Sequence, residues 1–215
     1  MDGVSAMTTT AGSSFWDRLA DKYARQPIAD EAAYQTKLRV SRSYFRPDMT
    51  LLELGCGTGS TAISHAPFVA HIRALDFSER MLEIARDKAE AAGIDNVTFE
   101  QADIAALSES AESYDIVLGL SILHLLKHPD AMIEEVFAML RPGGCFITST
   151  ACLGDTMAAL KFIAPLGRAV GLLPQLSVMS SAQLLDKFTS AGFTIAHQWL
   201  PGRGKALFVV ARKPG

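Results

Sequence analysis

The sequence contains the stretch Leu51-Leu52-Glu53-Leu54-Gly55-Cys56-Gly57-Thr58-Gly59-Ser60, in which an apolar run leads into three glycines at alternate positions. Apolar runs of this kind are typical of buried parallel strands, so residues 50–54 are predicted to form a strand. Glycine allows backbone angles and close approaches that a side chain would block. A strand, a glycine loop and a following helical pattern predict a nucleotide-like ligand at the carboxyl end of the strand.

The spacing of the glycines disfavours two phosphate-binding sites. A dinucleotide site requires Gly-x-Gly-x-x-Gly, but the third glycine is Gly59, and Ser60 stands where that glycine should be. A phosphate P-loop requires Gly-Lys-Ser/Thr, and the stretch contains no lysine. Glu53 adds a negative charge just before the loop, which suits a ligand with a cationic group better than a pyrophosphate.

The string Glu-x-Gly-x-Gly-x-Gly, formed by Glu53, Gly55, Gly57 and Gly59, resembles the first motif of class I S-adenosylmethionine-dependent methyltransferases. The Leu-Arg-Pro-Gly-Gly turn at residues 140–144 is also similar to that family. The resemblance covers residues 45–213. It implies an α/β fold: a three-layer sandwich with a mainly parallel seven-stranded sheet, which is Rossmann-like, and an antiparallel C-terminal hairpin.

The rest of the pattern agrees with five strand-helix units followed by a helix and a hairpin. Ser78 is predicted to cap a helix after the second strand, and Ser181 to cap a helix over residues 182–191 that ends at Gly192. Strands are predicted at residues 50–54, 71–76, 96–101, 113–120, 145–150, 193–200 and 206–211.

Acidic residues follow successive predicted strands. Asp76 follows Gly55 at the interval where an acid meets ribose hydroxyls in nucleotide-binding units. The resemblance implies that Asp103 accepts the adenine amino group, with Ile104 beside the ring. It also implies a helical N-terminal lid, in which Tyr23 and Tyr34 are candidates to reach the methionine end of the cofactor; the alternative is that both tyrosines only pack the helices onto the sheet. The implied cofactor residues are Tyr23, Glu53, Gly55, Cys56, Gly57, Gly59, Asp76, Phe77, Met81, Asp103, Ile104, Gly119 and Leu120.

His124 follows the fourth predicted strand and is the candidate catalytic base. Its unperturbed pKa of about 6.5 suits proton removal at neutral pH. The alternative is that His124 only lines the cleft or contacts the cofactor. The histidines have no spacing that suggests a metal site, and the expected cofactor is S-adenosylmethionine alone.

The length of 215 residues suits one domain, and 49% hydrophobic residues are enough for a large core. Residues 1–13 are predicted to be a disordered tail and residues 14–215 a single methyltransferase domain. Within it, residues 14–46 are expected to form a helical lid and residues 151–180 a cap. The apolar composition of the cap predicts a small, hydrophobic methyl acceptor; the alternative is that its side chains only cover the sheet or form a dimer contact.

The remaining expectations concern partners, location and alternative functions. A net charge of −3 gives no electrostatic case for nucleic acid. Three cysteines without metal-type spacing favour a reducing compartment, expected to be the cytoplasm. Stable membrane insertion is not expected, and a homodimer is a further expectation. Two other functions stay open: a non-catalytic S-adenosylmethionine-binding relative and a nucleotide-dependent oxidoreductase.

Overall fold

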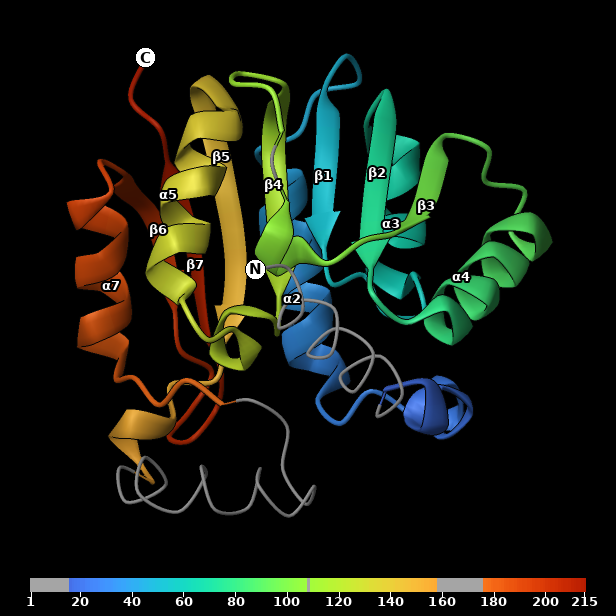
Figure 1. Ribbon diagram of the computed structural model, residues 1–215, viewed down its shortest axis with the longest axis horizontal. Coiled ribbons are helices and arrows are strands. Elements are labelled where there is room, and N and C mark those ends of the chain that lie inside the picture. The colour runs from blue at the N-terminus through green and yellow to red at the C-terminus, as the bar shows by residue number, and fades with distance from the viewer. Residues whose placement is uncertain (1–15, 108, 158–175) are drawn as a thin grey trace, which may run out of the picture. The chain divides into compact units, whose positions relative to one another are not determined.

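The computed structural model describes residues 16–107, 109–157 and 176–215. The chain divides into two compact units, Met1–Leu107 and Ser108–Gly215. In Figure 1 they run from blue to green and from green to red, respectively. The seven strands belong to one sheet in the order β3-β2-β1-β4-β5-β7-β6. This mixed α/β sheet confirms the predicted fold class.

The first unit contains three parallel strands in the order β3-β2-β1. In the register of this sheet Leu54 pairs with Leu75, and Asp76 pairs with Gln101. Because parallel strands end at the same edge, the loops after β1 and β2 emerge next to each other. The strands are β1 (Thr50–Leu54), β2 (His71–Asp76) and β3 (Val97–Gln101).

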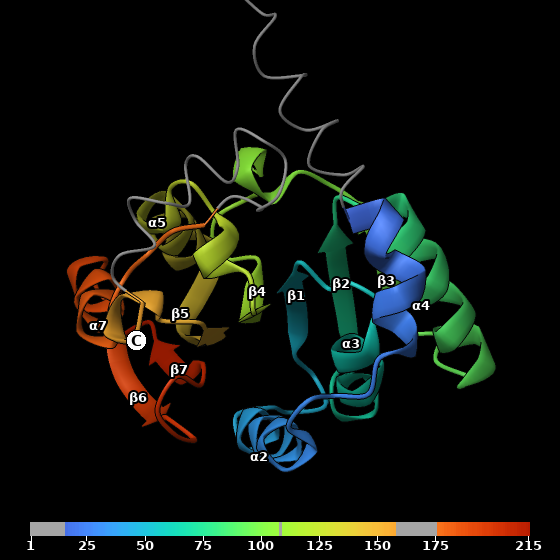
Figure 2. The ribbon, with the colours of Figure 1, turned by 90° about the horizontal axis from the view of Figure 1, so that it is seen from below.

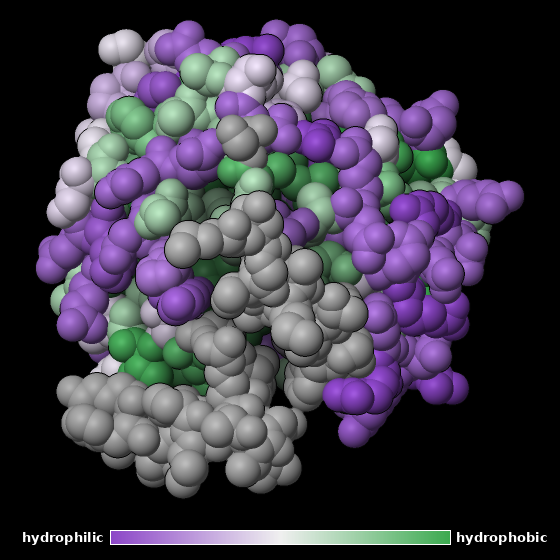
Figure 3. Space-filling model, viewed as in Figure 1, coloured by the Kyte–Doolittle hydropathy of each residue, from purple (hydrophilic) through white to green (hydrophobic). Residues whose placement is uncertain are grey.

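The helices of this unit are amphipathic and cover the strands. Helix α4 packs against β2 and β3 through buried side chains that include Met81 and Leu82. Its outward side is hydrophilic (Figure 3). A further helix at residues 16–25, the N-terminal helix, lies beside α4 (Figure 2). The others are α2 (Glu31–Arg42), α3 (Ser60–His65), η1 (Ala66–Phe68), α4 (Glu79–Ala91) and η2 (Ile104–Ala106).

The second unit has the strand order β4-β5-β7-β6. Strands β4 and β5 are parallel, whereas β7 is antiparallel to both β5 and β6, which confirms the predicted C-terminal hairpin. Helices α5 and α7 lie side by side (Figure 1). The elements are β4 (Tyr114–Leu120), η3 (Leu123–Leu125), α5 (Pro129–Met139), β5 (Leu140–Thr150), η4 (Leu153–Asp155), α7 (Ser181–Ser190), β6 (Thr194–Trp199) and β7 (Leu207–Arg212).

Four strands differ from the predicted bounds by one residue at one or both ends, namely β3, β4, β6 and β7, and two further boundaries differ for a clear physical reason. The turn predicted at residues 140–144 is part of β5, because the chain near the C-terminus supplies partners for it: the Lys213 amide donates to Gly144 O at 2.9 Å. The cap of α7 is Ser180 instead of Ser181, since the Ser180 hydroxyl accepts from the Gln183 amide and the Gln183 side chain accepts from the Ser180 amide. Reciprocal bonds of this kind satisfy two amides that a helix start would otherwise leave unpaired.

Several domain-level expectations remain predictions. The tail at residues 1–13 and most of the cap at residues 151–180 lie outside the described residues. The single domain and the lid role of residues 14–46 also stay predictions. Within the described residues, no helix is both long and apolar enough to cross a membrane.

Candidate functional site

The glycine loop follows β1 with all three glycines in the left-handed region, at φ values of 69°, 54° and 72° for Gly55, Gly57 and Gly59. A Cβ on Gly59 would lie 2.7 Å from the Ala85 Cβ, so that glycine is required by packing against α4. A Cβ on Gly57 would meet no described atom within 4 Å. The backbone at Gly57 is therefore open to the approach of a ligand.

Asp76 is joined directly to this loop. Its Oδ2 accepts a 2.8 Å hydrogen bond from the Gly57 amide, and its Oδ1 accepts a 3.0 Å bond from the Ser78 amide. Burial raises the pKa of Asp76, while the amides of Ser78, Gly57 and Phe77 oppose that rise. A carboxylate can accept about four hydrogen bonds, so capacity remains for the hydroxyls of a ligand.

Glu53, near the end of β1, is a buried acid with only 3% of its surface exposed. Burial, with the Asp76 charge as a smaller cause, raises the pKa of Glu53 to about 8. Among the described residues its Oε2 has no hydrogen-bond partner. A buried polar atom of this kind costs free energy unless a ligand supplies its partner.

Two further contacts hold the loop in place. The Cys56 amide donates to Leu75 O at 2.9 Å, and the Lys88 ammonium donates to the Thr58 hydroxyl at 2.9 Å. Burial raises the pKa of the Cys56 thiol, so this cysteine is not a thiolate nucleophile at neutral pH. Lys88 was not predicted as a site residue, because its position on α4 becomes meaningful only after the helix has packed against the loop.

The other predicted cofactor residues of the first unit differ in burial and in hydrogen bonding. Phe77 follows Asp76 directly, and Met81, five positions after Asp76, is buried at the first turn of α4. Asp103 uses Oδ1 to accept from the Ala105 amide at 3.0 Å, and Ile104 is buried. Tyr23, on the N-terminal helix, is 53% exposed. Its role at the methionine end stays a prediction.

The second unit holds Gly119, Leu120 and His124. A Cβ on Gly119 would lie 3.0 Å from the Phe146 ring, so packing already accounts for this glycine. His124 lies in η3 after β4, and its carbonyl accepts from the Ser177 amide at 2.7 Å. Burial lowers the pKa of His124, and its Nδ1 is buried without a partner in the described part of the chain. A neutral imidazole with a free nitrogen can accept a proton.

The polar groups at residues 53–76 can bind a ligand that has a cationic group and vicinal hydroxyls. The described residues contain no group of three or more His, Cys, Asp or Glu side chains arranged to hold a metal ion. The sequence interpretation missed Asp17, whose carboxylate accepts a hydrogen bond from Ser78. The available signal was the spacing of Asp17 and Asp21, which puts two acids on one side of the N-terminal helix.

Comparison with known proteins identifies the family. Residues 45–192 match the family model described as a methyltransferase domain. The chain is 30% identical over 152 residues to a malonyl-[acyl-carrier protein] O-methyltransferase of Paenibacillus sp. (strain JDR-2), covering 67% of this chain and 55% of that protein. It is 33% identical over 116 residues to a ubiquinone biosynthesis O-methyltransferase of Sinorhizobium fredii (strain NBRC 101917 / NGR234), covering 54% and 46%.

The fold also matches solved structures. The DhpI complex with SAH superposes with a TM-score of 0.73 at 20% identity, over 96% of this chain and 97% of that one. At this identity the likeness concerns the fold alone. The chain spans about half the length of the curated relatives that it matches. By the match over residues 45–192, the chain belongs to the methyltransferase-domain family, as its resemblance to class I S-adenosylmethionine-dependent methyltransferases predicted.

Proposed function

We propose that this protein transfers a methyl group from S-adenosylmethionine to a small, hydrophobic acceptor. The observation that carries the proposal is the hydrogen bond between the Gly57 amide and Asp76, with the buried acid Glu53 in the same unit. This geometry offers an open backbone, a fixed carboxylate and a second acid that lacks a full set of partners. A nucleoside with vicinal hydroxyls and a cationic amino-acid tail supplies a partner for each.

The residues have separate roles in this proposal. Asp76 accepts hydrogen bonds from the ribose hydroxyls, and Glu53 compensates the positive charge of the cofactor. The Gly57 backbone lets the ligand approach the loop. Phe77, Met81, Asp103 and Ile104 are assigned to the adenosine part, Tyr23 to the methionine end. The cofactor supplies an electrophilic methyl group, so the protein has to bind, orient and exclude water.

An oxygen acceptor is proposed first, because the names of both curated relatives describe O-methyltransferases. A hydroxyl becomes a better nucleophile when a base removes its proton, and His124 is assigned that role. Burial keeps His124 neutral at pH 7 by lowering its pKa, so the base needs no prior deprotonation. In the alternative assignment His124 only contacts the bound molecules. Its replacement then lowers their affinity and leaves kcat unchanged.

Calorimetry tests the cofactor assignment. The protein should bind S-adenosylmethionine and should not bind NAD. Binding of NAD would instead indicate an oxidoreductase. Asp76→Ala should weaken S-adenosylmethionine binding by about 1.5–3 kcal/mol, the usual range for hydrogen bonds to a charged group. Asp48→Ala is the control, because Asp48 is an exposed carboxylate of the same unit, paired with Arg46, and has no assigned role in binding. Equal affinity of wild type and Asp76→Ala would refute the ribose assignment.

A screen of hydrophobic phenols, carboxylic acids and amines then tests the acceptor class. Binding of the cofactor without methylation of any compound would favour a non-catalytic relative.

Phe162 and Leu173 belong to the predicted cap and lie outside the described residues. Changing each to serine should raise the acceptor KM if the cap binds acceptor, and should change the solution mass if this segment forms a homodimer contact. We also propose a cytoplasmic location, which agrees with the free thiols of Cys56, Cys145 and Cys152.

A further inference from the structure

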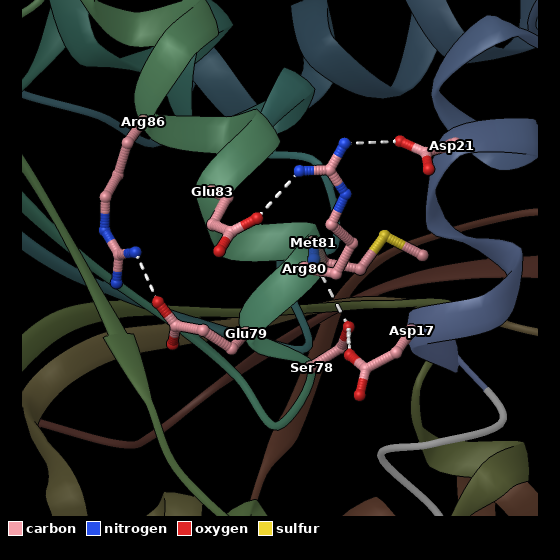
Figure 4. A network of polar contacts seen from close by, with 8 residues as sticks. All are labelled: Asp17, Asp21, Ser78, Glu79, Arg80, Met81, Glu83 and Arg86. Atoms are coloured by element: carbon pink, nitrogen blue, oxygen red, sulfur yellow. Dashed lines mark hydrogen bonds and ion pairs between the residues drawn. The ribbon is translucent and has the colours of Figure 1, made fainter.

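Two carboxylates of the N-terminal helix contact the start of α4 (Figure 4). Asp17 Oδ1 accepts a 2.5 Å hydrogen bond from the Ser78 hydroxyl. Asp21 Oδ1 forms a 2.7 Å ion pair with Arg80. The N-terminal helix is therefore attached to α4 by one contact at the cap of α4 and a second contact one turn further along its own axis.

The contact at Ser78 continues to the proposed ribose acid. Ser78 is fully buried, its hydroxyl donates to Asp17, and the same oxygen accepts from the Met81 amide at 3.2 Å. Its backbone amide donates to Asp76 Oδ1 at 3.0 Å. A continuous chain of hydrogen bonds thus runs from Asp17 through Ser78 and Asp76 to Gly57, all within the first unit.

We propose that Asp17 is a positioning residue for the cofactor, acting through Ser78 to hold Asp76 in the orientation that binds it. This inference rests on the proposed binding of S-adenosylmethionine at Asp76. Without Asp17 the buried Ser78 hydroxyl loses the acceptor for its proton, and a buried donor without a partner is costly. The Ser78 side chain then rotates so that its hydroxyl can reach another acceptor. The segment from Asp76 to Ser78 is therefore less strongly fixed.

The second contact contributes less than the first. Arg80 divides its guanidinium between Asp21 and Glu83, and the Arg80 and Asp21 side chains are 46% and 54% exposed. Exposed ion pairs add little stability because water screens them. The bond from the buried Ser78 hydroxyl to the half-buried Asp17 is therefore the contact on which the position of Asp76 depends.

Helix α4 has an anchor that does not involve the N-terminal helix. Glu79 pairs with Arg86 at 2.6 Å, and Arg86 also donates to the Phe99 carbonyl of β3 at 3.2 Å. The Glu79–Arg86 pair is half-exposed and adds little, but the buried side chains of α4 keep the helix on the sheet when Asp17 is changed; they are Met81, Leu82, Ala85 and Ala89. The effect of the substitution should therefore stay local to Ser78 and Asp76.

The test measures the dissociation rate constant of S-adenosylmethionine by surface plasmon resonance on the full chain. Asp17→Ala should raise it about tenfold, as expected for the loss of a hydrogen bond to a charged group. Asp21→Ala should change it by less than about threefold. Asp48→Ala removes an exposed carboxylate of the same unit, paired with Arg46, and should leave it unchanged. Asp17→Asn, which retains an acceptor oxygen, serves if Asp17→Ala unfolds.

A double-mutant cycle separates positioning from general destabilisation. In a Ser78→Ala background, Asp17→Ala should have no further effect, because the hydroxyl through which Asp17 acts is already absent. An equal effect of Asp17→Ala in both backgrounds would overturn the proposal. The fluorescence of Trp16, measured in a Trp199→Phe background, reports whether the N-terminal helix is released. An unchanged dissociation rate although this helix is released would also overturn the proposal. A wild type that binds no S-adenosylmethionine would instead refute the proposed function.

Discussion

The Gly57 amide donates a 2.8 Å hydrogen bond to Oδ2 of Asp76, 19 residues further along the chain. The bond forms because β1 and β2 are adjacent and parallel, so the residues that follow them share one edge of the sheet. It joins the glycine loop to the acid that was assigned to the ribose. The conformation of the loop and the orientation of the carboxylate are therefore set together.

Replacing Gly57 with asparagine should abolish cofactor binding and keep the fold. Asparagine tolerates positive φ better than most residues, so the backbone at φ 54° can persist. The new side chain would occupy the space that the ligand needs. Calorimetry with S-adenosylmethionine measures the loss. Gly93→Asn is the control, because Gly93 has φ 65° and open space around its Cβ position; equal affinity in the two variants would contradict the assignment.

Cofactor affinity should rise with pH and level off above about pH 8, because Glu53 has a raised pKa of about 8 in the free protein. Below that pH Glu53 is protonated, and a cationic ligand favours the carboxylate, so binding releases a proton. Calorimetry in buffers of different ionisation enthalpy counts the protons released. Glu53→Gln should remove this contribution; an identical pH dependence in wild type and Glu53→Gln would show that Glu53 does not sense the ligand.

His124→Ala should lower kcat by about 10²–10⁴ if His124 is the base. The loss should shrink at high pH, where the acceptor ionises without help. In the wild type, the rate should decrease on the acid side at a pH below the usual titration range of histidine, because burial lowers the pKa of His124. Steady-state rates across pH at saturating cofactor measure both effects. A reduced cofactor affinity with unchanged kcat would make His124 a binding residue.

His65 should make the protein sensitive to acid. It is fully buried, neither ring nitrogen has a hydrogen-bond partner among the described residues, and burial, with Arg42 as a smaller cause, lowers its pKa to about 3. The unfolded chain binds a proton there near pH 6.5, so this contribution to stability is present above pH 6.5 and is lost as the pH falls toward 3.

The difference in free energy of unfolding between His65→Leu and wild type should therefore change by about 1.4 kcal/mol per pH unit below pH 6.5. Urea denaturation at pH 7, 6 and 5 measures it. His65→Leu keeps an apolar group against Phe45, whose ring meets the imidazole edge-on at a centroid distance of 4.9 Å. Parallel stability curves for the two proteins would show that His65 is protonated in the fold.

Local pattern was sufficient for much of the fold. The bounds of β1 and β2 agree with the prediction residue for residue, because apolar runs bounded by glycine and by an acid mark buried parallel strands clearly. The Ser78 cap was also predicted, since its hydroxyl bonds an amide only three residues away. Ser180 was missed in favour of its neighbour because both are serines, and the choice depended on the reciprocal bond from Gln183.

By itself, the sequence determined the family motif, the order of strands and helices, and the chemical types at Glu53, Gly57 and Asp76, because these depend on residues close together in the chain. Only the tertiary structure decided that Gly57 bonds Asp76, that Lys88 holds Thr58, and that Asp17 accepts from Ser78. It also decided which glycine serves packing, since the clash at Gly59 comes from Ala85 on another element. Such contacts join residues 19 to 61 positions apart, and no local spacing specifies which partner the packed sheet and helices bring within hydrogen-bonding distance.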